Sequence, residues 1–112
     1  MNVSLYKVVP AEVWRSAEQE GLFRGSGIDL QDGFIHLSAA DQVVETVARH
    51  FAGQKDLMLI TIDGDKLGSA LRWEPSRDAA LFPHVYGVIP IEAVEKVDPL
   101  PLADDGTHRF PF

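Results

Sequence analysis

Two short stretches of this sequence, FIHLS and FPHVY, place a histidine among apolar residues at the spacing of a β-strand. Side chains alternate between the two faces of a strand, so His36 and His84 each share a face with a phenylalanine and a hydroxyl residue. A buried imidazole needs partners, because an unsatisfied polar group costs about 1–3 kcal/mol. Each histidine is therefore either a buried hydrogen-bonding residue or an acid–base group that faces a pocket.

The stretch LRWEP adds a carboxylate and an indole before the second histidine. Glu74 ends an apolar strand, where it could act as a base or bind a ribose hydroxyl, or could simply be solvated. Trp73 could stack on a planar ligand or fill the core, and Tyr86 could also stack on a ring. We select His36, His84 and Glu74 as the candidate catalytic residues.

Other chemistries find less support in the sequence. There is no cysteine, which excludes disulfides, thiolate catalysis and cysteine-ligated zinc. His36, His84 and Glu74 could form a set of two histidines and one carboxylate, but no local spacing resembles a metal motif, so we predict no metal. Ser38 lies in no G-x-S-x-G turn and fits a helix cap better than a nucleophile.

The elements that would position these residues are mostly strands. Apolar patterning predicts strands over residues 4–9, 34–37, 57–62, 71–74, 82–89 and 94–98. The run over 57–62 is continuously apolar, as in a central strand covered on both faces. Pro83 suggests an edge strand or the start of a strand, since proline cannot donate to a sheet.

Two helices are expected in the first half of the chain. Pro10 fits the first turn of one, which ends at Gly21. Ser38 and Asp41 resemble a capping box for the other, which ends at Gly53. His50, near the end of that helix, suits the negative end of the helix dipole. Residues 22–33 look like a long loop. Helices come early and strands dominate late, so we predict an α+β fold.

The chain as a whole reads as one small domain over residues 1–112. Its net charge of −7 argues against broad nucleic-acid binding, although a small ligand pocket can be locally positive. No segment reaches the roughly 20 apolar residues that span a membrane, and the N-terminus does not read as a signal peptide. We therefore expect a cytoplasmic protein without membrane contact. The oligomeric state stays open.

Several motifs in order resemble the family of domain of unknown function 952. They are GFIHLS, Gln42 in the following helix, LRWEP and FPHVYG, and the likeness runs over nearly the whole chain. The resemblance implies an ADP-ribosyltransferase-like fold, with a split, mostly antiparallel sheet around a cleft that holds a dinucleotide in relatives. Some proteins of that fold transfer ADP-ribose from NAD, and others use NAD to remove a 2′-phosphate from RNA.

The resemblance also implies roles for single residues. A histidine or arginine on the first strand contacts the ribose in such enzymes, and this sequence has Lys7 there, which could donate a hydrogen bond or contact phosphate. His36 and Ser38 would line the nicotinamide or ribose part of the cleft. The expected ligand-binding residues are therefore Lys7, Ser38, Trp73 and Tyr86.

Three interpretations follow. The chain could be an enzyme that binds NAD or another nucleotide and acts as a transferase or glycohydrolase. It could instead be a non-catalytic module that binds a small ligand in the same cleft. In the third, both histidines only stabilise the core.

Overall fold

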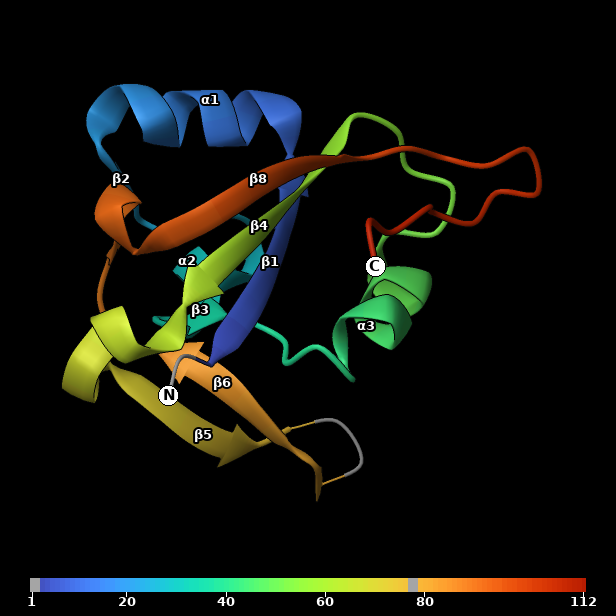
Figure 1. Ribbon diagram of the computed structural model, residues 1–112. Helices are drawn as coiled ribbons and strands as arrows, with labels where there is room; N and C mark the ends of the chain where they lie inside the picture. The colour runs from blue at the N-terminus through green and yellow to red at the C-terminus, as the bar shows by residue number, and fades with distance from the viewer. Residues whose placement is uncertain (1–2, 77–78) are drawn as a thin grey trace.

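A computed structural model describes residues 3–76 and 79–112 of the chain. Its strands are β1 (Ser4–Pro10), β2 (Leu22–Phe23), β3 (Ile35–His36), β4 (Leu57–Asp63), β5 (Leu71–Pro75), β6 (Leu81–Val85), β7 (Ile89–Pro90) and β8 (Val94–Leu100). Its helices are α1 (Ala11–Glu20), α2 (Ile28–Asp32) and α3 (Val43–His50), with 3-10 helices η1 (Gly64–Ala70) and η3 (Ile91–Ala93) (Figure 1). No helix of the described residues is long and apolar enough to cross a membrane.

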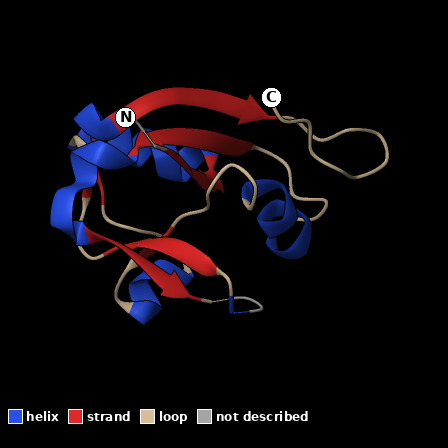
Figure 2. Cartoon of the chain, turned by 60° about the horizontal axis from the view of Figure 1, so that its bottom comes forward, coloured by secondary structure: helices blue, strands red, loops and turns tan. Residues whose placement is uncertain are grey.

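The strands form three antiparallel sheets with the orders β1–β4–β8, β3–β6–β5 and β2–β7. The two larger sheets lie in separate layers, with α3 beside them (Figure 2). The prediction of an α+β fold with antiparallel strands is thus confirmed. Two backbone hydrogen bonds between Tyr6 and Ser38, of 2.8 and 2.9 Å, join the edges of the larger sheets.

The central strand β4 has apolar residues on both faces, as its sequence predicts. Ile60 and Ile62 belong to the core cluster that includes Trp14 of α1. Leu57 and Leu59 belong to a second cluster, on the α3 side. Because neighbouring side chains point to opposite faces, a continuous apolar run suits a strand packed on both sides.

The start of α3 differs from the sequence prediction. The helix begins at Val43 after Gln42, and no side-chain cap hydrogen bond is formed. The Ser38 hydroxyl donates instead to Thr46 Oγ1 at 3.2 Å. The Gln42 side chain accepts from Ala39 N at 2.9 Å and donates to the carbonyl of Leu81 at 2.7 Å. The expected cap at Ser38 is therefore wrong, because its hydroxyl is used in a tertiary contact. The helix also ends earlier than predicted, at His50.

The predicted loop over residues 22–33 is also more ordered than expected. It contains strand β2 and the short helix α2. The Asp29 side chain of α2 is buried and accepts hydrogen bonds from the backbone N–H of Ser26 and of His36. Glycines with left-handed backbone angles, such as Gly25 and Gly33, make the turns around this helix. Local patterning missed α2 because a tertiary contact stabilises it.

The prediction that Pro83 marks an edge strand or the start of a strand is wrong, since β6 is the middle strand of its sheet and already begins at Leu81. The Pro83 carbonyl accepts from Leu37 N at 3.0 Å, so this side of the residue faces the chain just after β3. The nitrogen and carbonyl of a strand residue point to the same side. The missing N–H would have faced the Leu37 carbonyl just past the end of β3, so the proline ends this ladder there and does not interrupt it.

Candidate functional site

A pocket of about 460 Å³ opens between β1, β3, β6 and α3. Its walls are largely apolar and include Val8, Ile28, Leu37, Val43, Phe51 and Phe82. Its basic side chains are Lys7, His36, His50 and His84. A mostly apolar pocket with a few polar groups is the usual form of a small-molecule site, and this volume lies in the usual range of about 300–1,000 Å³.

The two predicted histidines meet across neighbouring strands. His36 of β3 is paired with His84 of β6, and their ring centroids are 5.3 Å apart. The ring of Phe34 packs against both, at 4.6 Å from His36 and 4.4 Å from His84. The stretches FIHLS and FPHVY are therefore spatial neighbours, and both histidines line the pocket.

His84 has one ring nitrogen held from behind. Its side chain is nearly buried, and Nδ1 lies 2.8 Å from Oε1 of Glu74 on β5. A carboxylate only accepts, so Nδ1 carries the proton and Nε2 is the nitrogen with a free lone pair. No residue in the described part of the chain makes a hydrogen bond to Nε2. His84 therefore offers the pocket a proton acceptor.

Glu74 is in turn held by Tyr86, whose hydroxyl donates to the same Oε1 at 2.7 Å. The hydrogen bonds from Tyr86 and then His84 hold the pKa of Glu74 below its usual value. The same contact raises the pKa of Tyr86. The Arg72 guanidinium lies 4.9 Å from the centroid of the Tyr86 ring, and Phe34 packs on that ring at 5.1 Å. Glu74 is thus a fixed carboxylate behind His84.

His36 is held on both sides. Nδ1 lies 2.7 Å from Asp29 Oδ1, and Nε2 lies 3.0 Å from Asp32 Oδ2. An imidazole can donate to both carboxylates at once only in its doubly protonated form. Neither nitrogen of His36 is left to accept a proton in this arrangement, so its geometry suits a fixed wall of the pocket better than a base.

Lys7 completes a buried ion pair beneath His36. Its Nζ lies 2.8 and 3.0 Å from the two oxygens of Asp29 and 2.9 Å from the carbonyl of His36. Burial alone raises the pKa of Asp29, but the charge of Lys7 and hydrogen bonds from Lys7, His36 and Ser26 together lower it. Three acceptors surround the ammonium group, so Lys7 ties β1 to α2 and β3.

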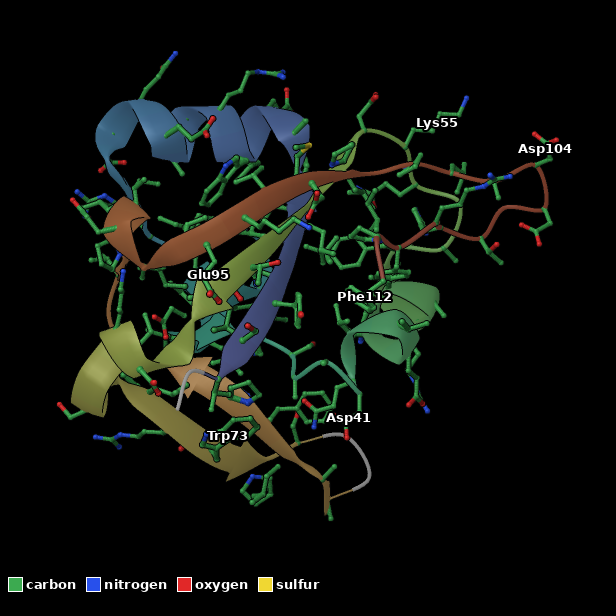
Figure 3. The ribbon with its side chains drawn as sticks, viewed as in Figure 1. Asp41, Lys55, Trp73, Glu95, Asp104 and Phe112 are labelled. Carbon is green, nitrogen blue, oxygen red and sulfur yellow. The ribbon has the colours of Figure 1, made fainter. Side chains whose placement is uncertain are left out.

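The structure brings most of the predicted site residues together. Four of the seven line the pocket, namely Lys7, His36, Ser38 and His84. Glu74 and Tyr86 lie behind His84 through their hydrogen bonds. Trp73 does not join them, because it alternates with Glu74 along β5 and so faces the opposite side of the sheet. It is 43% exposed and lies on β5 (Figure 3).

Sequence reasoning missed four residues of the site. Asp29, Asp32 and Thr46 were not considered, and His50 was assigned only to the helix dipole. Asp32 lies four residues before His36, but it ends α2 while His36 lies on β3, so their contact depends on the turn at Gly33 and no regular spacing indicates it. Asp29 gave no signal, because its partners lie on β1 and β3. Thr46 and His50 are four residues apart on α3, so a helical wheel could have placed both on one face. No group of three histidine, aspartate or glutamate residues in the described ranges could hold a metal ion.

The comparisons with other proteins identify a family. Residues 8–97 match the family described as protein of unknown function (DUF952), and the chain belongs to it. That span contains His36, His50, Glu74 and His84. No curated protein matches the chain significantly.

Solved structures of one relative share the fold. The crystal structure of protein CC0527 from Caulobacter crescentus has a TM-score of 0.91 and 42% identity, over 95% of this chain and 93% of that one. The solution NMR structure of the same protein has a TM-score of 0.83 and 42% identity, over 93% and 90%. The comparisons therefore show the family and the fold of this chain, and neither of them gives a function.

Proposed function

We propose that this protein is a small cytoplasmic enzyme that binds NAD or a related nucleotide in the pocket and cleaves or transfers at its glycosidic bond. The observation that carries the proposal is the pair of His84 and Glu74. Nδ1 of His84 is fixed by a carboxylate at 2.8 Å, and the protein leaves Nε2 to the pocket. A carboxylate behind a histidine orients a general base and stabilises the imidazolium that forms.

The proposed reaction is a hydrolysis at the ribose. His84 Nε2 takes a proton from water as the water oxygen bonds to C1′ of the ribose. The bond from C1′ to the nicotinamide nitrogen breaks, and its electron pair returns to the pyridinium ring. The products are ADP-ribose, neutral nicotinamide and a proton. With an acceptor hydroxyl in place of water, the same step is a transfer.

The pocket walls near the two histidines suit a ring of the ligand that is uncharged or cationic. Phe82 and Leu37 provide apolar contact, while Asp32 sits at the rim on the His36 side. A carboxylate there disfavours an anion and favours a pyridinium ring. Tyr86 and Trp73, proposed earlier as stacking residues, are less suited to this task, since Tyr86 lies behind Glu74 and Trp73 faces away.

We also propose that the arrangement is ADP-ribosyltransferase-like, with the pocket between the larger sheets in the place of the dinucleotide cleft. Antiparallel sheets joined at Tyr6 and Ser38 support this assignment. Lys7, at the first-strand position, would act by positioning His36 through Asp29 rather than by touching phosphate, because its ammonium group already has three acceptors.

Binding is the first test of the proposal. Ligand-observed NMR with NAD and ADP-ribose should show binding to the wild-type protein, with weaker binding to His36→Gln. The matched control is His108→Gln, a histidine in the C-terminal tail whose Nε2 lies 2.7 Å from the carbonyl of Gln54. No binding at millimolar concentration, together with no nicotinamide release, would refute the proposal.

A second candidate function is a non-catalytic binding module. It is favoured by the rigid double contact of His36 with Asp29 and Asp32, which suits recognition better than proton transfer. If the protein is such a module, His36→Gln and His84→Gln should alter the affinity for the ligand, and neither the wild-type protein nor any variant should turn over NAD. Any nicotinamide release that His84→Gln abolishes would count against it.

A further inference from the structure

Among the described residues, four basic side chains line the pocket, and three of them are paired with acids of the same chain. Lys7 lies 2.8 Å from Asp29, and Nδ1 of His84 lies 2.8 Å from Glu74. His36 contacts both Asp29 and Asp32. These pairs leave little positive charge for a ligand, because each of these basic groups already has a nearby anion.

His50 is the exception. It lines the pocket from the last turn of α3, and in residues 3–76 and 79–112 it has no carboxylate partner. Thr46, one turn earlier on the same helix, also lines the pocket and accepts a hydrogen bond from Ser38. The α3 wall therefore contains, beside its apolar residues, a hydroxyl group and a basic residue whose ring N–H can still be donated to a ligand.

The acidic residues of the site lie elsewhere. Asp29 and Asp32 belong to α2, and Figure 1 shows α2 apart from α3. An anionic group of a ligand is repelled at the α2 side by Asp32. At the α3 side it meets His50, which has no carboxylate partner in the part of the chain that the structure describes. The charge distribution of the pocket thus favours one orientation of a ligand that carries a ring and an anion.

We propose that His50 binds the anionic group of the ligand, which is the phosphate when a nucleotide is bound. This assignment rests on the proposed nucleotide function and adds its orientation: the ring lies at His36 and His84, and the phosphate lies at His50. Charge-assisted hydrogen bonds to phosphate are strong, but the free carbonyl groups at the end of α3 oppose an anion. We therefore expect a gain of about tenfold in affinity rather than a much larger one.

The experiment compares two ligands that differ by one phosphate. Nicotinamide mononucleotide and nicotinamide riboside are titrated by calorimetry into wild-type protein, His50→Gln and Arg49→Gln. Arg49 is the adjacent basic residue, but it does not line the pocket in the described structure. The mononucleotide should bind about tenfold more tightly than the riboside to wild type and Arg49→Gln, and His50→Gln should bind both alike. A preference that survives in His50→Gln would overturn the assignment.

A second titration separates this inference from the proposed function. Inorganic phosphate is added to the wild-type protein, and the ring signals of His50 and His108 are followed by NMR. Selective movement of the His50 signals supports the anion site even if neither nicotinamide ligand binds, in which case only the nucleotide proposal fails. If phosphate moves neither ring or both alike, and no ligand preference depends on His50, the anion site is refuted.

Discussion

The two histidines of the pocket differ in which nitrogens the protein leaves free. His84 lines the pocket, and its Nδ1 is bound to Glu74 while Nε2 has no hydrogen-bond partner among the described residues. His36 has both nitrogens bound, to Asp29 and Asp32. For the single residues, the proposed function therefore gives proton transfer to His84 and the shaping of the pocket to His36.

Tyr86 should keep Glu74 in its ionised form. Its hydrogen bond is the largest cause of the lowered pKa of Glu74, so Tyr86→Phe should raise that pKa toward the ordinary value. The carboxyl signal of Glu74 in an NMR pH titration measures the change. Trp73→Phe, on the opposite face of β5, is the control and should leave the titration unaltered. An unchanged pKa in Tyr86→Phe would show that the contact is not formed in solution.

Asp29 should be the most sensitive polar residue of the site for stability. Asp29→Asn leaves Lys7 buried without its counter-charge, which should lower the free energy of unfolding by about 3–5 kcal/mol. The half-exposed Asp32 is the control, and Asp32→Asn should cost about 1 kcal/mol or less. Urea unfolding at neutral pH measures both. Equal losses would contradict the buried ion pair.

The pH dependence follows from the direction of the same shift. The pKa of Asp29 is lowered in the folded protein, so its contribution to stability is complete above its ordinary value of about 3.9. That contribution is lost as the pH falls below about 4 through the folded value. Unfolding curves at successively lower pH should therefore show a loss in the wild-type protein that is smaller in Asp29→Asn. An identical acid loss in both proteins would refute the assignment.

At the scale of the element, the start of α3 depends on Gln42. Its side chain accepts from Ala39 N and donates to the Leu81 carbonyl, which ties the helix to β6. Gln42→Ala should lower the free energy of unfolding by about 1–2 kcal/mol, as expected for two hydrogen bonds. Asp41→Ala, in the exposed turn before it, should change stability by less than about 0.5 kcal/mol. Denaturant unfolding compares them, and a larger loss for Asp41→Ala would restore the capping box.

Elements with strong local patterns could be predicted from the sequence. The continuous apolar run of β4 and the helical spacing in α3 identify those elements, because burial repeats with their geometry. The helix α2 could not be predicted, since Asp29 is stabilised by Lys7 and His36 from other elements. The start of α3 was misjudged for the same kind of reason, because Ser38 and Gln42 use their side chains in tertiary contacts.

At the scale of the whole molecule, the pocket depends on how the two larger sheets are joined. The backbone pair of Tyr6 and Ser38 connects β1 to the chain after β3. The ring of Tyr6 also packs against Phe112 at 5.5 Å, and Phe112 packs on Phe110, which lies against the core cluster on the α3 side. The sequence motifs indicate that His36 and His84 are both candidate site residues. They do not predict that β3 pairs with β6, because this pairing joins distant parts of the chain.

The most direct test of the central claim is nicotinamide release from NAD, followed by chromatography. We predict release by the wild-type protein and by His108→Gln, and a rate at least about 100-fold lower in His84→Gln, because a general base contributes about 10²–10⁴. Thermal unfolding should confirm that all three proteins are folded. Release by His84→Gln at the wild-type rate, or no release by any of them, would contradict the role assigned to His84.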